Sequence, residues 1–290
     1  MGTLLQLTFS GLTVGAIYAL VAIGFTLIYR STDIFNFAQG EFFMLGGMVT
    51  ATGYSMGMPL AVAAGLAIAV TVACGLALHL FAIQPAKGAG SVQLLIITIG
   101  ASVLIRGVTS VTLGKDFAGF PNFVSPDVIR VDGAVIQTQA LIVLTGTAVM
   151  VAGLWMFLTR SVLGKAVTAT AANRIAARLV GINPSLIVAL CFGISALIGA
   201  VGGILGTPIT LTSYDAGTLL AVKGFAAAML GGLGNPFGPI VGGLFIGLLE
   251  AFGAGYVSSA YKDAFAFIVL LGVISFRPQG IFSGQAVERV

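Results

Sequence analysis

Residues 9–29, FSGLTVGAIYALVAIGFTLIY, decide the fold, because this run is predominantly apolar and contains no charged side chain. A helix needs about 20 consecutive, mostly apolar residues to cross the hydrocarbon core of a bilayer. The run therefore predicts a membrane-spanning helix near the start of the chain. No basic side chain precedes it and no small-residue cleavage site follows it, so we expect a retained span rather than a signal peptide.

Eight further apolar runs follow the first one along the chain. The nine runs cover residues 9–29, 40–56, 60–83, 94–113, 140–158, 186–209, 219–233, 237–252 and 264–276. The second, seventh and eighth are short or rich in glycine, so eight full spans plus a re-entrant piece fit as well as nine. We predict an all-α polytopic membrane protein with about eight or nine transmembrane helices, including re-entrant or broken ones, in a single domain over residues 1–290.

The composition supports this fold class and excludes others. Hydrophobic residues make up 58% of the chain and charged residues only 8%, whereas a soluble domain carries about a quarter charged residues. The 41 glycines lie largely inside the apolar runs, where small residues let helices approach closely in lipid. The net charge of +4 comes from 13 basic residues spread over loops, which indicates loop bias rather than a nucleic-acid surface. We expect Cys74 and Cys191 to be small buried apolar residues.

The loop charges predict the orientation, because cytoplasmic loops carry an excess of Lys and Arg. The segment at about 160–185 contains no acid and four bases, which are Arg160, Lys165, Arg174 and Arg178. The segment at about 114–138 carries both signs and suits the outer face. It also has β-branched runs on either side of Asp132-Gly133, which predict a short hairpin. This loop could dock a partner or simply close the bundle. The alternation puts the N-terminus outside and the C-terminus in the cytoplasm.

A polar stretch between the first two runs provides the first site candidates. Asn36, Gln39 and Glu41 lie beside Phe35 and Phe37. Non-helical polar backbone at membrane depth persists only where protein or a water-filled cavity surrounds it. We predict a re-entrant element that lines a translocation path, with a helix-capping turn at the cytoplasmic face as the alternative.

The fourth run adds weaker candidates for the same path. Arg106 is an ionisable side chain inside an apolar run, and such groups are costly in lipid and often functional. Thr98 and Ser102 precede it in the same run. Glu250 lies near the outer end of its span, and we expect Lys223 and Glu41, at span ends, to reach the interface through their long side chains.

The basic segment 163–184 predicts a short cytoplasmic helix. Its alanine-rich middle favours a helix, and Gly181 followed by Asn183-Pro184 ends it. Such a helix can dock in a groove of a soluble partner or lie on the membrane surface.

Several chemistries are excluded by the motifs. The glycine-rich stretch 223–243 lacks the Gly-Lys-Ser/Thr of a nucleotide-binding loop and fits crossing helices instead. His79 has no neighbouring ligand, so a metal site is not expected. No arrangement of catalytic side chains is present. We expect a chain that is not an enzyme and holds no cofactor.

Three motifs together resemble the LivH-type permeases of branched-chain amino acid ABC importers. They are Asn36–Glu41 within residues 11–47, residues 176–182, and residues 224–243 followed by 276–282. The resemblance runs from about residue 8 to residue 282. It implies a permease in a bacterial inner membrane that carries branched-chain or hydrophobic amino acids. Urea, amides, aromatic acids or sugars are alternative substrates, and an ion-coupled secondary transporter is a rival from another class.

The resemblance also implies partners. These are a second related permease, as a hetero- or homodimer, two cytoplasmic ATPase subunits that hold ATP-Mg, a periplasmic binding protein and membrane lipid, but no nucleic acid. The coupling loop of such importers has the pattern E-A-A, three residues, then G. The positions that match or flank it here are Arg174, Ala176, Ala177, Arg178 and Gly181, while Ile175 stands at the acidic position. We expect the two arginines to supply polar contacts to the ATPase.

Overall fold

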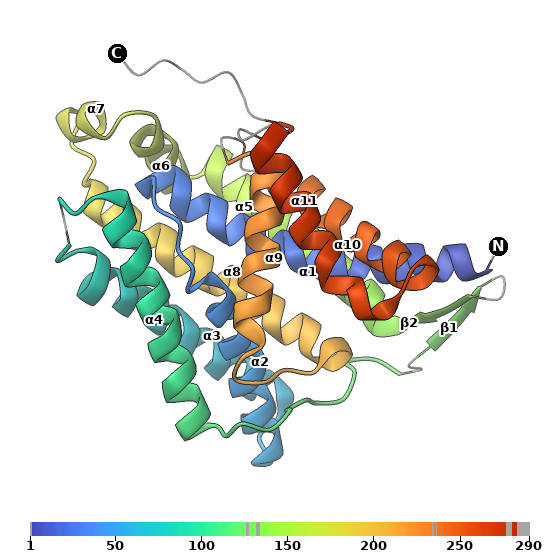
Figure 1. Cartoon of the computed structure of the whole chain (residues 1–290). Coiled ribbons are helices and arrows are strands. Elements are labelled where there is room, and N and C mark those ends of the chain that lie inside the picture. The colour runs from blue at the N-terminus through green and yellow to red at the C-terminus, as the bar shows by residue number, and fades with distance from the viewer. Residues whose placement is uncertain are drawn as a thin grey trace.

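The computed structural model describes residues 2–86, 88–125, 128–131, 134–233, 235, 237–276 and 280–282. Almost all of these residues are helical (Figure 1). The elements are α1 (Gly2–Thr32), α2 (Gln39–Ser55), α3 (Leu60–Ala77), a π-helical turn (Leu78–Ile83), α4 (Ser91–Thr112), β1 (Val128–Val131), β2 (Ala134–Gln137), α5 (Thr138–Arg160), α6 (Val162–Ala172), α7 (Arg174–Leu179), α8 (Pro184–Thr210), α9 (Ala216–Gly231), α10 (Gly238–Tyr256), a 3₁₀ turn (Ser259–Tyr261) and α11 (Lys262–Phe276). The prediction of an all-α polytopic membrane protein is confirmed.

Each of the nine predicted runs corresponds to a helix, but the helices differ in length. Six described helices are long and apolar enough to cross a bilayer. Three others are shorter, with 17 residues in α2, 16 in α9 and 15 in α11. The eighth run, which we expected to be short or glycine-rich, belongs to α10. This helix has 19 residues and is one of the six that are long enough to cross a bilayer. The bundle thus combines full-length spans with shorter helices.

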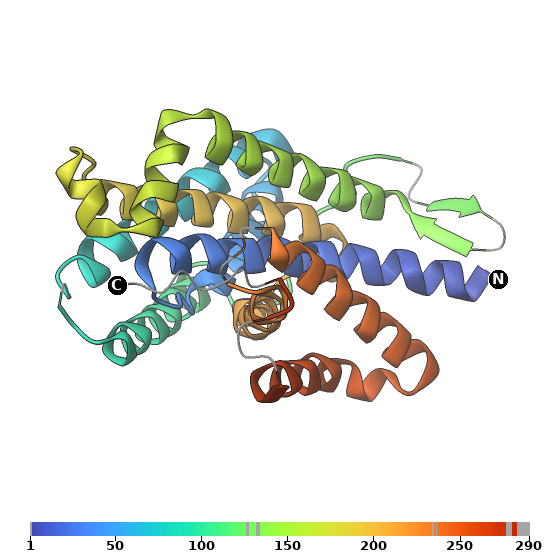
Figure 2. The same cartoon turned by 90° about the horizontal axis from the view of Figure 1, so that it is seen from above.

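Helix α1 forms the centre of the bundle, with α8, α9 and α10 packed around it (Figures 1 and 2). Its contact with α10 depends on glycine. A Cβ at Gly15 would lie 2.8 Å from the Cα of Leu244, and a Cβ at Gly247 would lie 2.3 Å from the backbone nitrogen of Gly15. A side chain at either position would separate the two helices. The expected role of the glycines inside the apolar runs is therefore confirmed at this crossing.

The helix ends gather on two sides of the bundle. In Figure 1 the start of α1 and the β-hairpin lie at one side, and α6 and α7 lie at the other. The predicted hairpin is confirmed, since β1 and β2 pair antiparallel with Val128 opposite Gln137. Asp132 and Gly133, on which that prediction depended, lie outside the described residues. Cys191 is buried and Cys74 is half-buried, which agrees with their expected role.

The basic segment forms two helices where we expected one. Helix α6 ends at Ala172, and the Asn173 side chain accepts hydrogen bonds from the backbone nitrogens of Ile175 and Ala176, at 2.9 and 3.0 Å. Asparagine competes well for backbone donors and is a favoured N-cap, so it starts α7 afresh. Gly181 then adopts a φ of +85°, which glycine tolerates, and directs the chain into α8.

Candidate functional site

The segment between α1 and α2 is non-helical and largely buried. Helix α1 ends where Asp33 adopts a left-handed φ of 59°, which Asp tolerates better than most residues. The Thr32 hydroxyl accepts a hydrogen bond from the Ile34 nitrogen at 3.2 Å, and the Asn36 side-chain oxygen accepts one from the Ala38 nitrogen at 3.2 Å. These bonds satisfy the turn locally and let α2 start inside the bundle.

Thr98 on α4 forms hydrogen bonds to the backbone of the segment between α1 and α2. Its hydroxyl accepts a hydrogen bond from the Phe37 nitrogen at 3.2 Å and lies within donating distance of the Phe35 carbonyl oxygen, at 3.1 Å. Thr98 is completely buried. One α4 side chain therefore satisfies two backbone groups of the irregular segment, which otherwise would cost free energy in a buried position.

Two further polar contacts continue along the same face of α4. The Ser102 hydroxyl donates to a Glu41 carboxylate oxygen at 2.9 Å, and Arg106 donates to the Thr218 hydroxyl at 2.8 Å. Thr98, Ser102 and Arg106 are four residues apart, so they lie above one another on one helical face. We call Glu41, Thr98, Ser102, Arg106 and Thr218 the polar stripe.

Close packing of α2 against α9 places the stripe. A Cβ at Gly40 would lie 1.9 Å from the Gly217 carbonyl oxygen, and a Cβ at Gly217 would lie 2.4 Å from a Glu41 carboxylate oxygen. Only glycine fits at these two positions. The start of α9 therefore approaches Glu41 closely enough for Thr218 to lie beside it and meet Arg106.

Gln39 and Asn36 do not join the stripe through any hydrogen bond found in the described part of the chain. Gln39 points to α8, where its amide nitrogen donates to the Ser195 carbonyl oxygen at 3.2 Å and its side-chain oxygen accepts from the Ser195 hydroxyl at 2.5 Å. The Ser195 hydroxyl oxygen also lies 3.0 Å from the Gly24 carbonyl oxygen, a second acceptor within reach of its single proton. The geometry of Gln39 thus joins α1, α2 and α8, while Asn36 caps the turn.

An aromatic cluster adjoins the turn. Phe35 stacks on Tyr29 with ring centroids 4.6 Å apart, and Phe225 from α9 contacts Phe35 and Phe37 at 5.1 and 5.5 Å. Phe25 completes the group from α1. Phe35, Phe37 and Phe225 are each half-buried. The polar stripe therefore borders an apolar surface of aromatic rings.

A second charged group lies deep in the bundle, and the sequence interpretation missed it. Lys223 pairs with Glu250 at 2.8 Å and with Asp263 at 2.6 Å. The Tyr18 hydroxyl donates to Glu250 at 2.7 Å and accepts from Lys223 at 3.0 Å. Lys223 and Glu250 are 3% and 1% exposed. The expectation that Lys223 and Glu41 reach the interface is wrong. Two carboxylates hold the Lys223 ammonium group inside the bundle, and Glu41 is completely buried, where it accepts from Ser102.

A signal for this charge cluster exists in the sequence. Lys223, Glu250 and Asp263 are three ionisable residues of opposite sign in or next to the last three apolar runs. Burying an unpaired charge costs roughly several kcal/mol. Residues of opposite charge in neighbouring apolar runs are therefore expected to pair with one another. Spacing alone does not show which helix faces bring them together.

The candidate coupling residues divide into buried and exposed ones. Ala177 is 2% exposed, and Arg174 donates to the Ser31 carbonyl oxygen at the end of α1. The outward face of α7 is apolar, with Ile175 at 74%, Leu179 at 84% and Val180 at 75% exposure. Ala176, Arg178 and Gly181 are exposed as well. Both arginines line a cavity of about 520 Å³ between α7 and the start of α8 and α4.

Among the described residues, no group of three or more His, Cys, Asp or Glu side chains is placed to hold a metal ion. His79 is buried and lies against the Phe192 ring, with centroids 5.5 Å apart.

Comparisons with known proteins agree on one family. Residues 7–274 match the family described as branched-chain amino acid transport system, permease component. The chain is 34% identical to the high-affinity branched-chain amino acid transport system permease protein BraD of Pseudomonas aeruginosa, over 99% of this chain and 98% of that protein. It is also 34% identical to the permease protein LivH of Escherichia coli K12, over 99% and 97% of the two chains.

A solved structure shares the fold. The chain is similar to one chain of PsaBC from Streptococcus pneumoniae in complex with Fab, with a TM-score of 0.51 and 14% sequence identity. The similarity covers 96% of this chain and 93% of that one. At this level of identity the likeness supports the arrangement of helices alone.

Proposed function

This chain belongs to the family of branched-chain amino acid permease components, and from that premise we propose that it forms part of the translocation path of an ATP-driven importer for branched-chain and other hydrophobic amino acids. It is a multi-pass membrane protein. The importer would contain a second related permease, two ATPase subunits that bind ATP-Mg, and an extracytoplasmic binding protein. ATP hydrolysis would be the task of the ATPase subunits.

The polar stripe is the observation that carries the assignment of the path. Helix α4 is largely exposed, and Thr98 and Thr109 are its buried residues. Ser102 and Arg106 nevertheless lie on this helix. A charged guanidinium facing hydrocarbon is costly. The face with Arg106 and Thr218 therefore fits a water-filled path shared with a second permease better than it fits lipid.

The aromatic cluster supports the substrate class. A zwitterionic amino acid needs polar groups for its charged end and apolar surface for its side chain. Ser102 and Arg106, which are half-buried, provide the first with Glu41 buried behind Ser102, and Phe35, Phe37 and Phe225 provide the second on the adjoining surface. Urea would use the polar groups but not the rings.

We propose that α7 contacts the ATPase through its apolar face. Ile175 stands at the position that is acidic in the E-A-A pattern, and it is exposed together with Leu179 and Val180. An apolar ridge on a short helix suits a hydrophobic groove of a soluble partner. Arg178 flanks this ridge, whereas Arg174 is engaged by the Ser31 carbonyl oxygen and would act by fixing α7 to α1.

The orientation follows from the same assignment. The side with α6 and α7 would face the cytoplasm, and the side with the N-terminus and the β-hairpin would face outward (Figure 1). The binding protein would then dock near the hairpin and the loops around it. The C-terminus would be cytoplasmic.

Transport by a reconstituted importer tests the function. Proteoliposomes with this permease, its ATPases and its binding protein should take up labelled leucine, isoleucine and valine only when ATP is inside. A panel with urea, an amide, an aromatic acid and a sugar tests the substrate class. Uptake of leucine by the permease without ATPases would contradict the proposal and support an ion-coupled transporter.

A paired comparison on α7 tests the coupling role. Ile175→Asp with Leu179→Asp should lose ATPase binding and uptake, because it places charge in an apolar contact. Arg174→Glu with Arg178→Glu should uncouple ATP hydrolysis from uptake if the arginines transmit the signal. Val162→Asp, at an equally exposed apolar position on α6, is the matched control. Normal coupling in both double variants would exclude α7 as the contact.

A further inference from the structure

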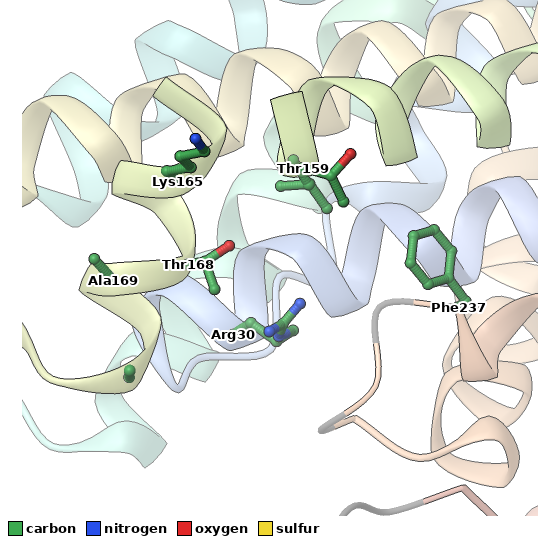
Figure 3. Close-up of a pocket in the computed structure, with 8 residues that line it drawn as sticks. Arg30, Thr159, Lys165, Thr168, Ala169 and Phe237 are labelled. Carbon is green, nitrogen blue, oxygen red and sulfur yellow. The ribbon is translucent and has the colours of Figure 1, made fainter. Parts of the chain in front are cut away.

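A basic cavity lies where four helices meet on the side of the bundle that contains α6. It has a volume of about 510 Å³ and opens between the end of α1, the end of α5, α6 and the start of α10 (Figure 3). Its lining includes Arg30, Thr159, Lys165, Thr168 and Phe237. Figure 3 shows Arg30 on α1 with Thr168 of α6 beside it, and Lys165 farther along α6 on the side of Thr168 away from Arg30.

The cavity has positive charge without a matching negative charge. Arg30 is half-buried in the last turn of α1, and it makes no hydrogen bond or ion pair with the described residues. Lys165 is exposed. Among the described residues that line the cavity, none is acidic. The Thr159 and Thr168 hydroxyls donate to the Trp155 and Gly164 carbonyl oxygens at 2.7 and 3.1 Å, so the two cations are the donors that the described lining offers to a ligand. They suit an anion with several acceptor oxygens, such as a phosphate group.

An apolar groove continues from this cavity toward the bilayer. The groove has a volume of about 630 Å³, lies between α1, α5 and α10, and shares Phe237 with the cavity. Its other lining residues include Leu144, Val151, Trp155, Ile240 and Leu244. From Trp155 to Leu144 the α5 axis advances about 16 Å at 1.5 Å per residue. This is about half of the roughly 30 Å hydrocarbon core, the depth of one leaflet.

We propose that the cavity and the groove together bind one anionic phospholipid. Its phosphate would lie between Arg30 and Lys165, and an acyl chain would follow the groove along Leu144 and Val151. Basic pockets between transmembrane helices on the cytoplasmic side suit acidic headgroups. Trp155 is 48% exposed and lines the groove on the α5 turn next to the cavity. Tryptophan is enriched at the membrane–water interface, which fits a position near the lipid headgroup. A basic cavity that continues into an apolar groove matches the charged headgroup and the acyl chain of one lipid molecule. We therefore favour a lipid over a protein helix as the occupant.

Trp155 provides the probe, because it is the single tryptophan of the chain and it lines the groove. The full-length chain is placed in bicelles of neutral phosphatidylcholine and titrated with phosphatidylglycerol that has brominated acyl chains, which quench tryptophan fluorescence. Half-maximal quenching should need about 25-fold less phosphatidylglycerol than brominated phosphatidylcholine, because two nearby cations contribute about fivefold each. The same mole fraction for both lipids would overturn the proposal.

Charge variants test the headgroup contact. Arg30→Gln with Lys165→Gln should bring the preference for phosphatidylglycerol to within about twofold of none, since each nearby cation contributes about fivefold to the binding of acidic lipid. Arg30→Lys with Lys165→Arg should keep the preference. Arg160→Gln removes a charge at the same end of α5 but outside the lining of this cavity, and it should leave the lipid preference unchanged. An unchanged preference in the first variant, or an equal loss in the control, would overturn the site.

A matched pair on α5 tests the groove. Ala148 lines it, whereas its neighbour Val149 is 69% exposed and is not part of the lining. Ala148→Phe should fill the groove and reduce quenching at saturation, and Val149→Phe should not. Equal effects of the two would contradict an acyl chain in the groove.

Two arms separate the lipid from other occupants. Inorganic phosphate, compared with chloride at equal ionic strength, should leave the quenching unchanged, and displacement by it would point to a free-phosphate site instead. Native mass spectrometry of the assembled transporter should detect retained phosphatidylglycerol with the wild-type chain and much less with Arg30→Gln/Lys165→Gln. The absence of retained acidic lipid from both would mean that a partner subunit covers the groove, and it would overturn the proposal.

Discussion

Helix α9 carries two polar regions that differ in almost every physical respect. Thr218 belongs to the polar stripe and is exposed, while Lys223, five residues later, is 3% exposed within the charge cluster. In the stripe, Arg106 has a neutral hydroxyl as its partner. In the cluster, Lys223 has two carboxylates and a tyrosine hydroxyl. The stripe thus contains a cation without a carboxylate hydrogen-bonded to it, whereas neighbouring carboxylates neutralise the cation of the cluster.

The charge cluster joins four helices. Tyr18 lies on α1, Lys223 on α9, Glu250 on α10 and Asp263 on α11. Each member bonds at least one other. Removal of one charge would leave another buried without a partner, so this region should act on stability first. The stripe has an exposed edge, so changes there should act on transport and leave the fold intact.

The largest expected effect is that of Lys223→Met. It leaves Glu250 buried without its cation, and breaking a buried pair in this way costs about 3–5 kcal/mol. The half-exposed Asp263 would add little. Thermal unfolding of the purified chain in detergent should show a markedly lower midpoint. Lys223→Met with Glu250→Gln removes both charges and should recover part of the loss, and a midpoint as high as that of the wild type in the single variant would contradict a structural role.

The sequence is sufficient for the fold class because the length of an apolar run can be compared directly with the thickness of the bilayer. All nine runs correspond to helices, since length and hydropathy are local properties. The break at Asn173 was not predicted, because alanine-rich flanks favour a continuous helix and one capping side chain decides otherwise.

The site candidates show the same limit. Thr98, Ser102 and Arg106 have the spacing of one helical face, so the sequence identifies them together. Their partners Glu41 and Thr218 lie on other helices, and only the close approach of Gly40 and Gly217 brings these in. Gln39 was expected with Glu41, yet the two side chains point in different directions from the first turn of α2. Tertiary packing, not residue type, separates them.

Glu41→Gln compared with Glu250→Gln sharpens the contrast between the regions. Glu41→Gln keeps the shape and weakens the Ser102 bond from a charge-assisted one to a neutral one, a difference of about 1 kcal/mol. ATP-driven uptake should fall about fivefold with little change in the unfolding midpoint. Glu250→Gln should do the opposite, lowering the midpoint because Lys223 loses a buried counter-charge. Equal loss of stability in the two variants would remove the distinction.

The smallest expected effect is that of Thr218→Val, which removes the hydroxyl that accepts from Arg106 while keeping the side-chain shape. The bond lies at an exposed position, and an exposed change of this kind alters stability by less than about 0.5 kcal/mol. A bond to a charged donor is worth up to about 1.5–3 kcal/mol when buried, so about 1 kcal/mol is a reasonable upper limit for this one. Uptake should therefore decrease by at most about fivefold.

Thr218→Ser keeps the acceptor oxygen and should transport like the wild type, which separates the hydrogen bond from the methyl group. Both variants should unfold at the wild-type midpoint, because Arg106 can turn to water once Thr218 no longer accepts its bond. That freedom is what the buried Lys223 lacks one and a half turns further along α9. If Thr218→Val lowered the midpoint as much as Lys223→Met, the start of α9 would be a structural joint, and the path would have to be sought on another face of α4.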